Sequence, residues 1–292
     1  MACPVTVYAI ILNYNNAEDT IECIRSAKSI SSVNIKIILV DNGSDKKCID
    51  ILEKNIDPDV VFIKNENNIG YAGGNNVGIH YAITDGAQYI AIVNNDVILN
   101  DSTFPGCITR LQNNEVGIVG PTILEYGSTL IQSCGAMVNK NKVQSNLINR
   151  GKEYKKSDSI ISCDYIGGAC LVFKSSLVSI IGYLPEEYFL FWEETEWCLK
   201  AKKAGLSVEC ILCGTVEHKG SATIKQVSGI SNYYMERNKL IFIKRNYNSF
   251  TDRLFAYCYL LVRALVKSLL NGNIEYISYY FDGLLGKDRF VN

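Results

Sequence analysis

Residues 89–99 read YIAIVNNDVIL, an apolar run that ends in Asn94, Asn95 and Asp96 before apolar residues resume. Short runs rich in Val, Ile and Tyr are typical of strands that are buried on both faces of a parallel sheet. Polar side chains at the end of such a strand are costly unless a turn or a ligand satisfies them. The stretch therefore predicts a buried strand over 89–93 that ends in a polar turn at one edge of a sheet.

Three similar apolar runs precede this stretch, and segments with helical patterns lie between the runs. The sequence predicts strands over 5–12, 35–40 and 60–63, and helices over 18–29, 45–55 and 75–84. A repeated β-α-β pattern is typical of a doubly wound, mostly parallel sheet with right-handed crossovers and helices on both faces. We therefore expect an α/β fold.

Polar residues cluster directly after all four predicted strands, in the segments NYNN, DNGSD, NENNIGYAGGNN and NND. In an open α/β sheet the carboxyl ends of parallel strands meet at one edge, where ligands bind. Four successive strands that end in Asn, Asp and Gly therefore predict a lined crevice at that edge.

The second half of the chain departs from this alternation. Short alternating segments between residues 121 and 166 predict a small antiparallel insert. The core resumes over 163–185, and EETEWCLKAKKAGL predicts a helix with acids in its first turn and Gly205 at its end. SVECILC predicts a further strand, and residues from 228 onward predict helices.

The 292 residues are 48% apolar and 20% charged, which is typical of a globular protein, and the net charge of −1 gives no reason to expect a nucleic acid partner. Eleven cysteines in a chain of this length do not predict a small disulfide scaffold, and Cys210 and Cys213 have no second pair to complete a zinc site. No run reaches the ~20 apolar residues of a membrane span, and the first residues lack the basic region of a signal peptide. We therefore expect a cytoplasmic protein with reduced cysteines.

Two of the polar segments suggest nucleotide contacts. Asp41, directly after a predicted strand, either accepts hydrogen bonds from a pyrimidine or a ribose hydroxyl, or builds a turn with Asn42. NIGYAGGNN is glycine-rich and opens a predicted helix, so its backbone N–H groups could bind an anion. The alternative is a tight connection that requires a positive φ at Gly73 or Gly74. The segment matches neither the G-x-G-x-x-G fingerprint nor the P-loop.

Asn94, Asn95 and Asp96 also suggest a site for a hard metal ion. Mg²⁺ and Mn²⁺ need few protein oxygens when a substrate diphosphate supplies the others, so one carboxylate and one further ligand suffice. His218 in VEHKG follows a predicted strand and is the candidate second ligand through a neutral imidazole. The alternative for the asparagines is a turn in left-handed conformation. His80 lies in a predicted helix and is interpreted as structural.

FLFWEETEW at 189–197 is the strongest indication of catalysis. Trp192 and Trp197 flank a run that holds Glu193, Glu194 and Glu196. Aromatic neighbours desolvate a carboxylate, which raises its pKa and makes it a better general base near neutral pH. The alternative is that acids at a helix N-terminus only complement the helix dipole.

Taken in series, these motifs resemble a known family, the inverting family 2 glycosyltransferases of the GT-A fold, and within it the rhamnosyltransferase-like branch. The resemblance covers about residues 5–248 and rests on ILNYNN, VDNGSD, NENNIGYAGGNNVGI, YIAIVNNDVIL, GIVGPTIL, YIGGACLVFK, FLFWEETEWCLKAKKAG, VEHKGS and YYMERNKLIFIKR. It implies a GT-A catalytic domain over 1–248, with a mostly parallel Rossmann-like sheet and a small antiparallel insert. A helical C-terminal extension would follow over 249–292.

The resemblance also assigns roles to residues. Asp96 matches the last aspartate of the family's D-x-D motif and His218 a histidine that shares the metal, Mn²⁺ or Mg²⁺. Glu194 matches the second acid of the family's Glu-Asp pair, which is the general base, and Glu193 and Glu196 are supporting acids. Glu194 and Glu196 stand where the family more usually has aspartates. The candidate nucleotide-sugar site comprises Tyr14, Asn15, Asp41, Asn68, Gly74, Asn75, Asn94, Asn95 and Trp192.

The implied reaction moves one hexose, with inversion, from a nucleotide diphosphate sugar (dTDP-rhamnose or a UDP-hexose) to a hydroxyl of a cell-surface polysaccharide or lipid-linked oligosaccharide. One alternative is an inactive sugar-nucleotide-binding protein, or a scaffold in a polysaccharide assembly complex. The other is a nucleotidyltransferase. That class needs a basic residue near the first loop, where NYNNAED offers none before Arg25.

The C-terminal segment combines basic charge with a helical apolar pattern. From residue 239 to residue 292 it holds eight Lys or Arg residues against four acids. An apolar stripe recurs at helical spacing through Phe255, Tyr259, Val262, Val266 and Leu269. We expect this stripe to pack against the catalytic domain or to form a homodimer interface. The alternative is a peripheral contact with the inner face of the plasma membrane.

Overall fold

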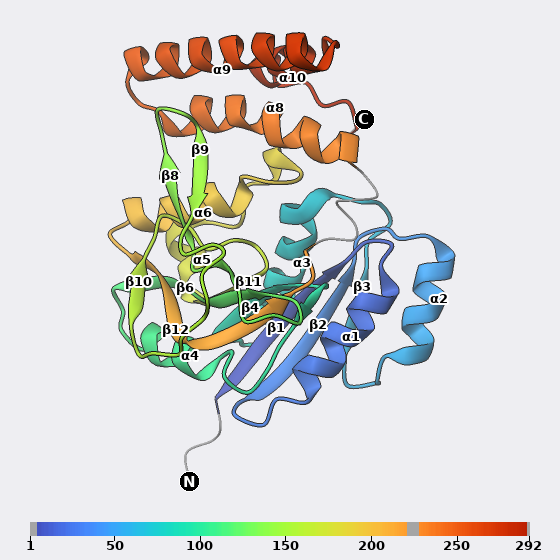
Figure 1. Ribbon diagram of the computed structural model, residues 1–292. Coiled ribbons are helices and arrows are strands. Elements are labelled where there is room, and N and C mark those ends of the chain that lie inside the picture. The colour runs from blue at the N-terminus through green and yellow to red at the C-terminus, as the bar shows by residue number, and fades with distance from the viewer. Residues whose placement is uncertain (1–4, 221–227, 291–292) are drawn as a thin grey trace.

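The computed structural model describes residues 5–220 and 228–290. Residues 1–4 of the predicted N-terminal segment and Ser221 of VEHKGS therefore lie outside the described residues. The strands of the main sheet are β1 Thr6–Asn13, β2 Asn34–Asp41, β3 Val61–Lys64, β4 Tyr89–Asn94, β5 Val97–Ile98, β6 Val116–Glu125, β7 Ile131–Ser133, β10 Ile160–Ser162, β11 Cys170–Lys174 and β12 Ser207–His218. Within the described part they form one ten-stranded sheet (Figure 1). Eight of the strands follow the order β10-β12-β6-β11-β4-β1-β2-β3. Of the other two, β5 pairs with β12 and β7 pairs with β6.

The four strands predicted from the first half of the sequence are confirmed to within one residue at each end. β1 pairs in parallel with β2 and β4, and β2 pairs in parallel with β3. The register sets Asn13 opposite Asp41, and Leu12 opposite Asn94. The polar ends of these strands therefore meet at one edge of the sheet, as the sequence pattern indicates.

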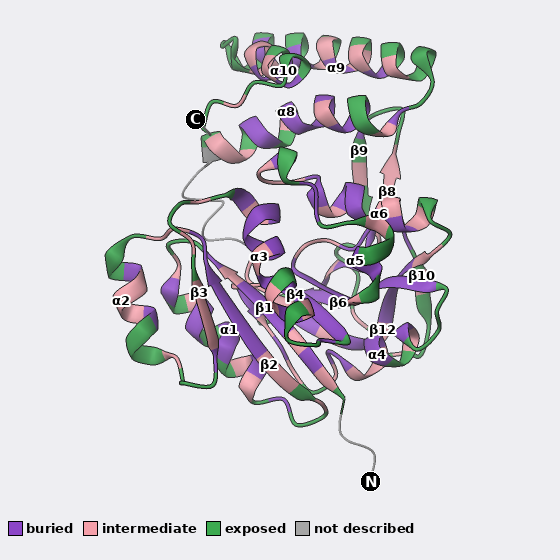
Figure 2. Ribbon diagram, turned by 180° about the vertical axis from the view of Figure 1, so that it is seen from behind, coloured by how far each residue is buried: buried purple, intermediate pink, exposed green. Residues whose placement is uncertain are grey.

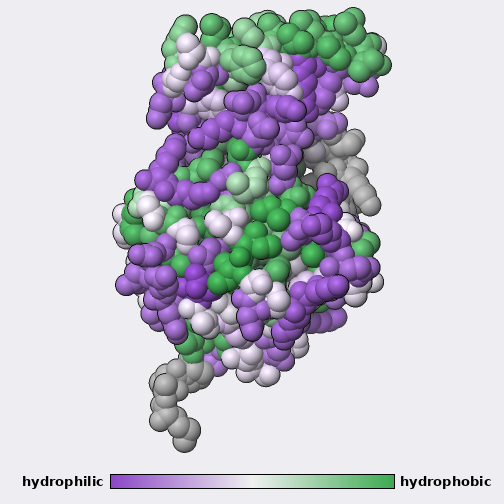
Figure 3. All heavy atoms as spheres, turned by 60° about the vertical axis from the view of Figure 1, so that its left-hand side comes forward, coloured by the Kyte–Doolittle hydropathy of each residue, from purple (hydrophilic) through white to green (hydrophobic). Residues whose placement is uncertain are grey.

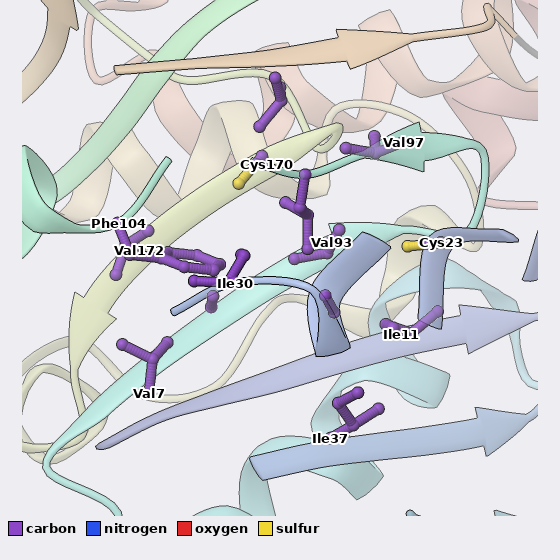
Figure 4. Packing of buried hydrophobic residues seen from close by; sticks show 14 of the residues in the cluster. Val7, Ile11, Cys23, Ile30, Ile37, Val93, Val97, Phe104, Cys170 and Val172 are labelled. Carbon is purple, nitrogen blue, oxygen red and sulfur yellow. The ribbon is translucent and has the colours of Figure 1, made fainter. Parts of the chain in front are cut away.

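Helices cover both faces of the sheet because alternate residues of each buried strand point to opposite sides. The helices are α1 Ala17–Lys28, α2 Lys46–Asn55, α3 Gly70–Thr84, α4 Pro105–Leu111, α5 Ser176–Ile181 and α6 Glu193–Lys203. Val7, Ile11 and Val93 pack with α1, α2 and α4 on one face, as Figure 4 shows for part of this cluster. Ile10, Ile90 and Ile92 pack with α3, α5 and α6 on the other.

The predicted start of α3 is wrong by five residues. The helix begins at Gly70 rather than at residue 75, so Gly73 and Gly74 lie inside it, and the positive φ belongs to Gly70, at +80°. A Cβ on Gly74 would lie 2.4 Å from Leu12 Cδ1, and one on Gly78 would lie 2.5 Å from Ile10 Cγ2. These glycines therefore allow the helix to approach β1 closely.

The other half of the sheet is mixed. β11 runs antiparallel to β4 and β6, whereas β12 runs parallel to β6. The predicted antiparallel insert is present, as β7, β10 and a separate hairpin of β8 Ala136–Asn139 and β9 Gln144–Leu147. It begins later than residue 121, because Pro121 still lies within β6. The ten cysteines of the described part are free thiols.

Three helices at the end of the chain form layers above the catalytic core: α8 Ser228–Asn246, α9 Phe250–Asn271 and α10 Glu275–Leu285 (Figure 1). α8 lies between the core and the other two helices, and one hydrophobic cluster joins Tyr188 and Trp192 to residues of α8, α9 and α10. The division of the chain at residue 248 stays a prediction, because α8 packs both against the core before it and against α9 and α10 after it.

The expectation that the apolar stripe of α9 packs against the catalytic domain is wrong. Phe255, Val262, Val266 and Leu269 are exposed, and the buried side of α9 carries Ala256, Leu260, Ala264 and Ser268 instead. In Figure 2 the side of α9 that faces α8 is buried and the outer side is exposed.

Candidate active site

The first two loops at the carboxyl edge are tied together by hydrogen bonds. Asn13 Nδ2 donates to Asp41 Oδ1 at 2.6 Å, and the backbone N–H of Ser44 donates to Asp41 Oδ2 at 2.9 Å. Asp41 is fully buried, so in this conformation it builds the turn, and a direct contact with a nucleotide stays a prediction. Asn15 accepts from the Asp45 N–H at 2.8 Å, while Tyr14 leaves its ring exposed at the edge.

The second and third loops are joined in the same way. Asn42, which is buried, donates to Asn68 Oδ1 at 2.9 Å, and the Gly70 N–H donates to the same oxygen. At the N-terminus of α3 the Tyr71 N–H is already used, because it donates to the Phe189 carbonyl at 2.6 Å. An anion contact of the remaining N–H groups of the glycine-rich segment stays a prediction.

Gly74 and Asn75 lie inside α3 rather than on a loop. Both are buried, and Asn75 donates to the Tyr71 carbonyl at 2.9 Å. Asn75 Oδ1 is a buried acceptor without a hydrogen-bond partner among the described residues. The structure therefore gives Gly74 a packing role, and a donor contact of either residue stays a prediction.

Asp96 and His218 are brought together, although 121 positions of sequence separate them. β5 pairs antiparallel with the end of β12, which sets His218 opposite Val97. His218 Nε2 lies 3.1 Å from Asp96 Oδ1, and both side chains are largely buried. His218 Nδ1 lies 2.7 Å from Gln132 Oε1 on β7, which fixes the orientation of the ring.

This pair fits two ligands of a divalent cation. In the neutral tautomer that donates Nδ1–H to Gln132, Nε2 carries the lone pair that a metal ligand requires, and it lies beside Asp96 Oδ1. Ligands at about 2.1 Å in octahedral geometry lie about 3 Å apart, close to the observed separation. A histidine that binds metal usually donates its other N–H to a second group, here Gln132. Over the described ranges no cluster of three or more His, Cys, Asp or Glu residues could hold a metal, so the candidate site has two side-chain ligands.

Asn94 and Asn95 shape the adjoining turn. Asn95 Nδ2 donates to Thr20 Oγ1 at 2.9 Å, and Thr20 in turn donates to Asn13 Oδ1 at 2.8 Å. The left-handed alternative for these asparagines is wrong, because neither is among the described residues with positive φ. The turn is thus connected to α1 and to the loop after β1.

The loop before α6 has an unusual backbone. Phe189, Phe191 and Trp192 have left-handed conformations, with φ of 62°, 68° and 79°. Bulky residues rarely adopt such conformations unless the surrounding structure imposes them, and these conformations cluster at functional sites. We call residues 188–192 the strained loop.

Asn238 of α8 holds the strained loop in place. Its fully buried Nδ2 group donates to the carbonyl oxygens of Tyr188, Leu190 and Phe191 at 2.8, 2.7 and 3.1 Å. On the other side a Cβ on Gly70 would lie 2.5 Å from the Phe189 carbonyl oxygen. The loop is therefore clamped between α3 and α8. Sequence reasoning assigned no role to Asn238, although it lies within the quoted motif YYMERNKLIFIKR.

The strained loop delivers Glu193 and Glu194 to a desolvated position at the start of α6. Glu193 is 2% exposed, and burial raises its pKa well above the ordinary value, with a further rise from the charge of Glu194. Burial also raises the pKa of Glu194, while the N–H groups of its own residue and Gly168 act against the rise. Each has an Oε2 atom that is buried and has no partner among the described residues.

Tyr71 connects the acids to the candidate metal site. Its hydroxyl donates to the Gly168 carbonyl at 2.9 Å. Burial raises its pKa well above 10, and the charges of Glu194, Glu193 and Asp96 all add to the rise. Tyr71 therefore lies within electrostatic reach of both halves of the site, a role that the sequence reasoning missed.

Glu196 does not share the environment of its neighbours, which corrects the grouping of three desolvated acids. It accepts from Arg245 Nη2 at 2.8 Å, Tyr188 Oη at 2.6 Å and Asn246 Nδ2 at 2.9 Å. Although burial alone would raise its pKa, these bonds, led by Arg245, lower it to about 2. Glu196 is thus an ionised anchor between α6 and α8.

The two tryptophans also differ. Trp197 donates to the Gly182 carbonyl at 2.9 Å and packs edge-on against Phe173. Trp192 packs against Phe242, and its buried Nε1–H has no acceptor within the described residues. Of the two tryptophans, only Trp192 therefore has an indole N–H left to donate to a ligand, which agrees with its predicted contact with the nucleotide sugar.

The chain is similar to sugar transferases. Residues 8–180 match the model of the family described as glycosyl transferase family 2. The chain is 25% identical over 283 residues to the low-salt glycan biosynthesis hexosyltransferase Agl10 of Haloferax volcanii, covering 92% of this chain and 86% of that protein. It is 24% identical over 256 residues to the dTDP-rhamnosyl transferase RfbF of Shigella flexneri, covering 82% and 81%.

Two solved structures share its fold. One is GalNAc-T7 with UDP, GalNAc and Mn²⁺, with a TM-score of 0.60, 13% identity and coverage of 89% of this chain. This chain spans only 55% of that protein's length. The other is S. aureus TarS 1-349, with a TM-score of 0.54, 15% identity and coverage of 96% and 81%. The expected GT-A fold is confirmed.

Proposed function

We propose that this chain, a glycosyltransferase that belongs to glycosyl transferase family 2, moves a hexose from a nucleotide diphosphate sugar to a hydroxyl of a glycan or lipid-linked glycan. Rhamnose is the first candidate for the transferred sugar. The proposed reaction inverts the anomeric carbon and uses a divalent metal. The two relatives support this, since one is named a hexosyltransferase and the other a dTDP-rhamnosyl transferase. UDP-hexoses are the next candidate donors. The proposal departs from the scaffold and nucleotidyltransferase alternatives, which the family assignment does not favour.

One observation carries the proposed mechanism. Tyr71, whose hydroxyl donates to the Gly168 carbonyl, has its pKa raised by burial and by the charges of both Glu194 and Asp96, the partner of His218. This supports one site that holds the desolvated Glu194 and the Asp96–His218 pair. A carboxylate with a raised pKa and an unpartnered buried oxygen is suited to take a proton from an acceptor hydroxyl as that oxygen attacks the sugar. Inversion requires this carboxylate to act on the side of the sugar opposite the leaving group.

Asp96 and His218 are the residues that would hold Mn²⁺ or Mg²⁺. A bound divalent ion supplies charge neutralisation for the leaving diphosphate. The imidazole ligand favours Mn²⁺, because Mg²⁺ takes oxygen ligands more strictly. GalNAc-T7, whose fold is similar, was crystallised with Mn²⁺. Tyr14, Asn15 and Asn68 are the proposed contacts to the nucleotide.

The test is a panel of nucleotide sugars incubated with Mn²⁺, Mg²⁺ or a chelator, with nucleotide release as the readout. We expect release from a rhamnose or hexose donor that the chelator abolishes, and NMR of the product should show the inverted anomer. Asp96→Asn and His218→Ala should each weaken Mn²⁺ binding in calorimetry. His80→Ala is the matched control, since His80 lies exposed on α3. Undiminished release in chelator would refute the metal, and retention at the anomeric carbon would refute the mechanism.

A further inference from the structure

The outermost layer of the molecule exposes a continuous apolar surface. On α9 it consists of Phe255, Val262, Leu265, Val266, Leu269 and Leu270, which we call the outer apolar face. Leu269 is 81% exposed and Leu270 is 80% exposed. Phe281 and Leu285 extend the surface onto α10. Figure 3 shows hydrophobic residues gathered over this layer and a band of hydrophilic residues beneath it. Patches of this kind mark interaction sites rather than ordinary surface.

Two cations of α9, Arg263 and Lys267, pair with α8 and do not belong to this face. Lys267 Nζ lies 2.6 Å from Glu236 Oε1 on α8, and Arg263 Nη2 lies 3.8 Å from the same oxygen. Lys239 of α8 also pairs with Glu236, at 2.8 Å. The helix therefore turns these two cations inward and its apolar residues outward, which is the reverse of a helix that faces water.

α9 lies along the surface of the protein rather than across a membrane. It is the one helix among the described residues that is long and apolar enough to span a bilayer. Its inner side is already occupied, because Ala256, Leu260 and Ala264 are buried in the cluster with α8. Its ion pairs with Glu236 would be lost if it left that cluster. The geometry is that of a helix with one side on protein and one side unpartnered.

Unpaired lysines lie at the corner where α9 begins. Lys140 and Lys142 are exposed on the turn between β8 and β9, and Lys244 is exposed near the end of α8. Tyr247, three residues before Phe250, donates its hydroxyl to the Lys140 carbonyl, which fixes this turn beside the start of α9. None of the three lysines has an ion pair within the described ranges. A basic rim beside an apolar face is complementary to an anionic lipid surface.

We propose that the outer apolar face inserts into the interfacial layer of a bilayer that contains anionic lipid, with α9 parallel to the membrane plane. A lipid surface fits better than a second copy of the chain. Protein interfaces carry about one hydrogen bond per 100–200 Å², and the six residues of this face offer no side-chain donor or acceptor. A bilayer requires none. The inference goes beyond the proposed reaction and does not depend on it.

The experiment is co-sedimentation of the full chain with vesicles of phosphatidylcholine, with and without phosphatidylglycerol. We expect binding that is stronger with phosphatidylglycerol. The double variant V266E/L269E should bind at least about tenfold more weakly, since it removes two apolar side chains from the inserted face. Ile180→Glu is the matched control, because Ile180 is an exposed apolar residue on α5. K140Q/K142Q should reduce binding to the anionic vesicles only.

Three results would overturn the inference. The first is no sedimentation of the wild-type chain with either vesicle. The second is equal binding of V266E/L269E and the wild-type chain. The third is a dimer in light scattering without vesicles that V266E/L269E converts to a monomer, which would make the face an interface between copies. Circular dichroism and nucleotide release from a soluble donor should match the wild type in every variant, which separates loss of binding from loss of folding or of activity.

Discussion

Glu194 and Glu196 lie two residues apart in the first turn of α6, yet their surroundings oppose each other. Glu194 has a buried oxygen without a partner in the described part of the chain and a raised pKa, because burial disfavours its charge. Glu196 is 1% exposed, but Arg245, Tyr188 and Asn246 hold it ionised with a pKa of about 2. The same residue type in the same helical turn thus serves proton transfer at one position and anchoring at the other.

The difference arises from α8, which is some 50 residues further along the chain. Arg245 and Asn246 of that helix reach Glu196, whereas Asn238 donates to the backbone of the strained loop and accepts from Arg237. No cation among the described residues forms an ion pair with Glu193 or Glu194. Whether a carboxylate at this site is held ionised therefore depends on whether a cation of α8 reaches it.

The largest expected effect concerns the acid without a cation. Glu194→Gln should lower kcat by ~10²–10⁴-fold, the usual contribution of a general base, with donor binding largely retained. Because the pKa of Glu194 is raised, wild-type kcat should fall as pH drops through that value, and the variant should lose this dependence. The measurement is a kcat–pH profile for both proteins. Near-normal turnover in the variant would remove Glu194 from the role and break the comparison.

The next effect tests the clamp on the strained loop. Asn238→Ala removes three hydrogen bonds to the backbone of the strained loop, so Glu194 should lose its position. We expect kcat to fall by about 10–100-fold, with the KM for the donor within about threefold of the wild type. Asn238→Asp keeps the size but loses the N–H donor, and it should behave like the alanine variant. Asn232→Ala, an exposed position on the same helix, is the control. Wild-type kcat in Asn238→Asp would reduce Asn238 to packing.

The third effect is on stability. Glu196→Gln removes the buried carboxylate from the Arg245 guanidinium, which is 31% exposed and keeps only Glu187 as its partner among the described residues, so the free energy of unfolding should fall by about 2 kcal/mol at pH 7. The contribution of Glu196 is present above its unfolded pKa and is lost as pH falls toward about 2, because its folded pKa is depressed. Denaturant titrations at several pH values should show the two proteins converging as the solution is acidified. The kcat of the folded variant should stay within about tenfold of the wild type. A greater loss would give Glu196 a part in catalysis.

The smallest expected effect concerns the stability contributed by Glu193, the buried acid next to Glu194. The folded pKa of Glu193 is raised, so its stabilising contribution is present below the unfolded pKa and is lost as pH rises through the folded value. Glu193→Gln is neutral at every pH and nearly the same shape. Its unfolding free energy should lie within about 1 kcal/mol of the wild type in acid and exceed the wild type at pH 8. Variant stability that falls relative to the wild type with rising pH would show that Glu193 is stabilised as an anion.

Much of the fold could be predicted because it rests on local patterns. The strands β1, β2, β3 and β4 are short apolar runs that end in polar residues, and a period-two or continuous pattern depends only on neighbouring residues. The start of α3 was missed because Gly70, Gly73 and Gly74 suggest a loop. Their small size instead allows contact with Leu12 and with the strained loop, which is a tertiary cause.

The candidate site could be predicted only in part. Asp96 and His218 were found from their places after strands, and the structure sets them 3.1 Å apart. Gln132 could not be found, because β7 is a three-residue strand with no distinctive pattern. Arg245 and Asn238 lie within the motif YYMERNKLIFIKR, but no roles could be predicted for them. Their partners depend on how α8 packs against the core, which a local sequence pattern does not reveal.

The strained loop also has a consequence for the order of assembly. Its left-handed residues are opposed by local preference, so they are expected to settle only after α8 has docked and Asn238 has reached the carbonyl groups of the loop. The last strand of the sheet ends at residue 218, so every strand of the described sheet is made before α8 begins. During synthesis, therefore, a chain that ends before residue 238 would hold a formed sheet with an unfinished base site, and catalytic competence would be acquired only when the final helices emerge.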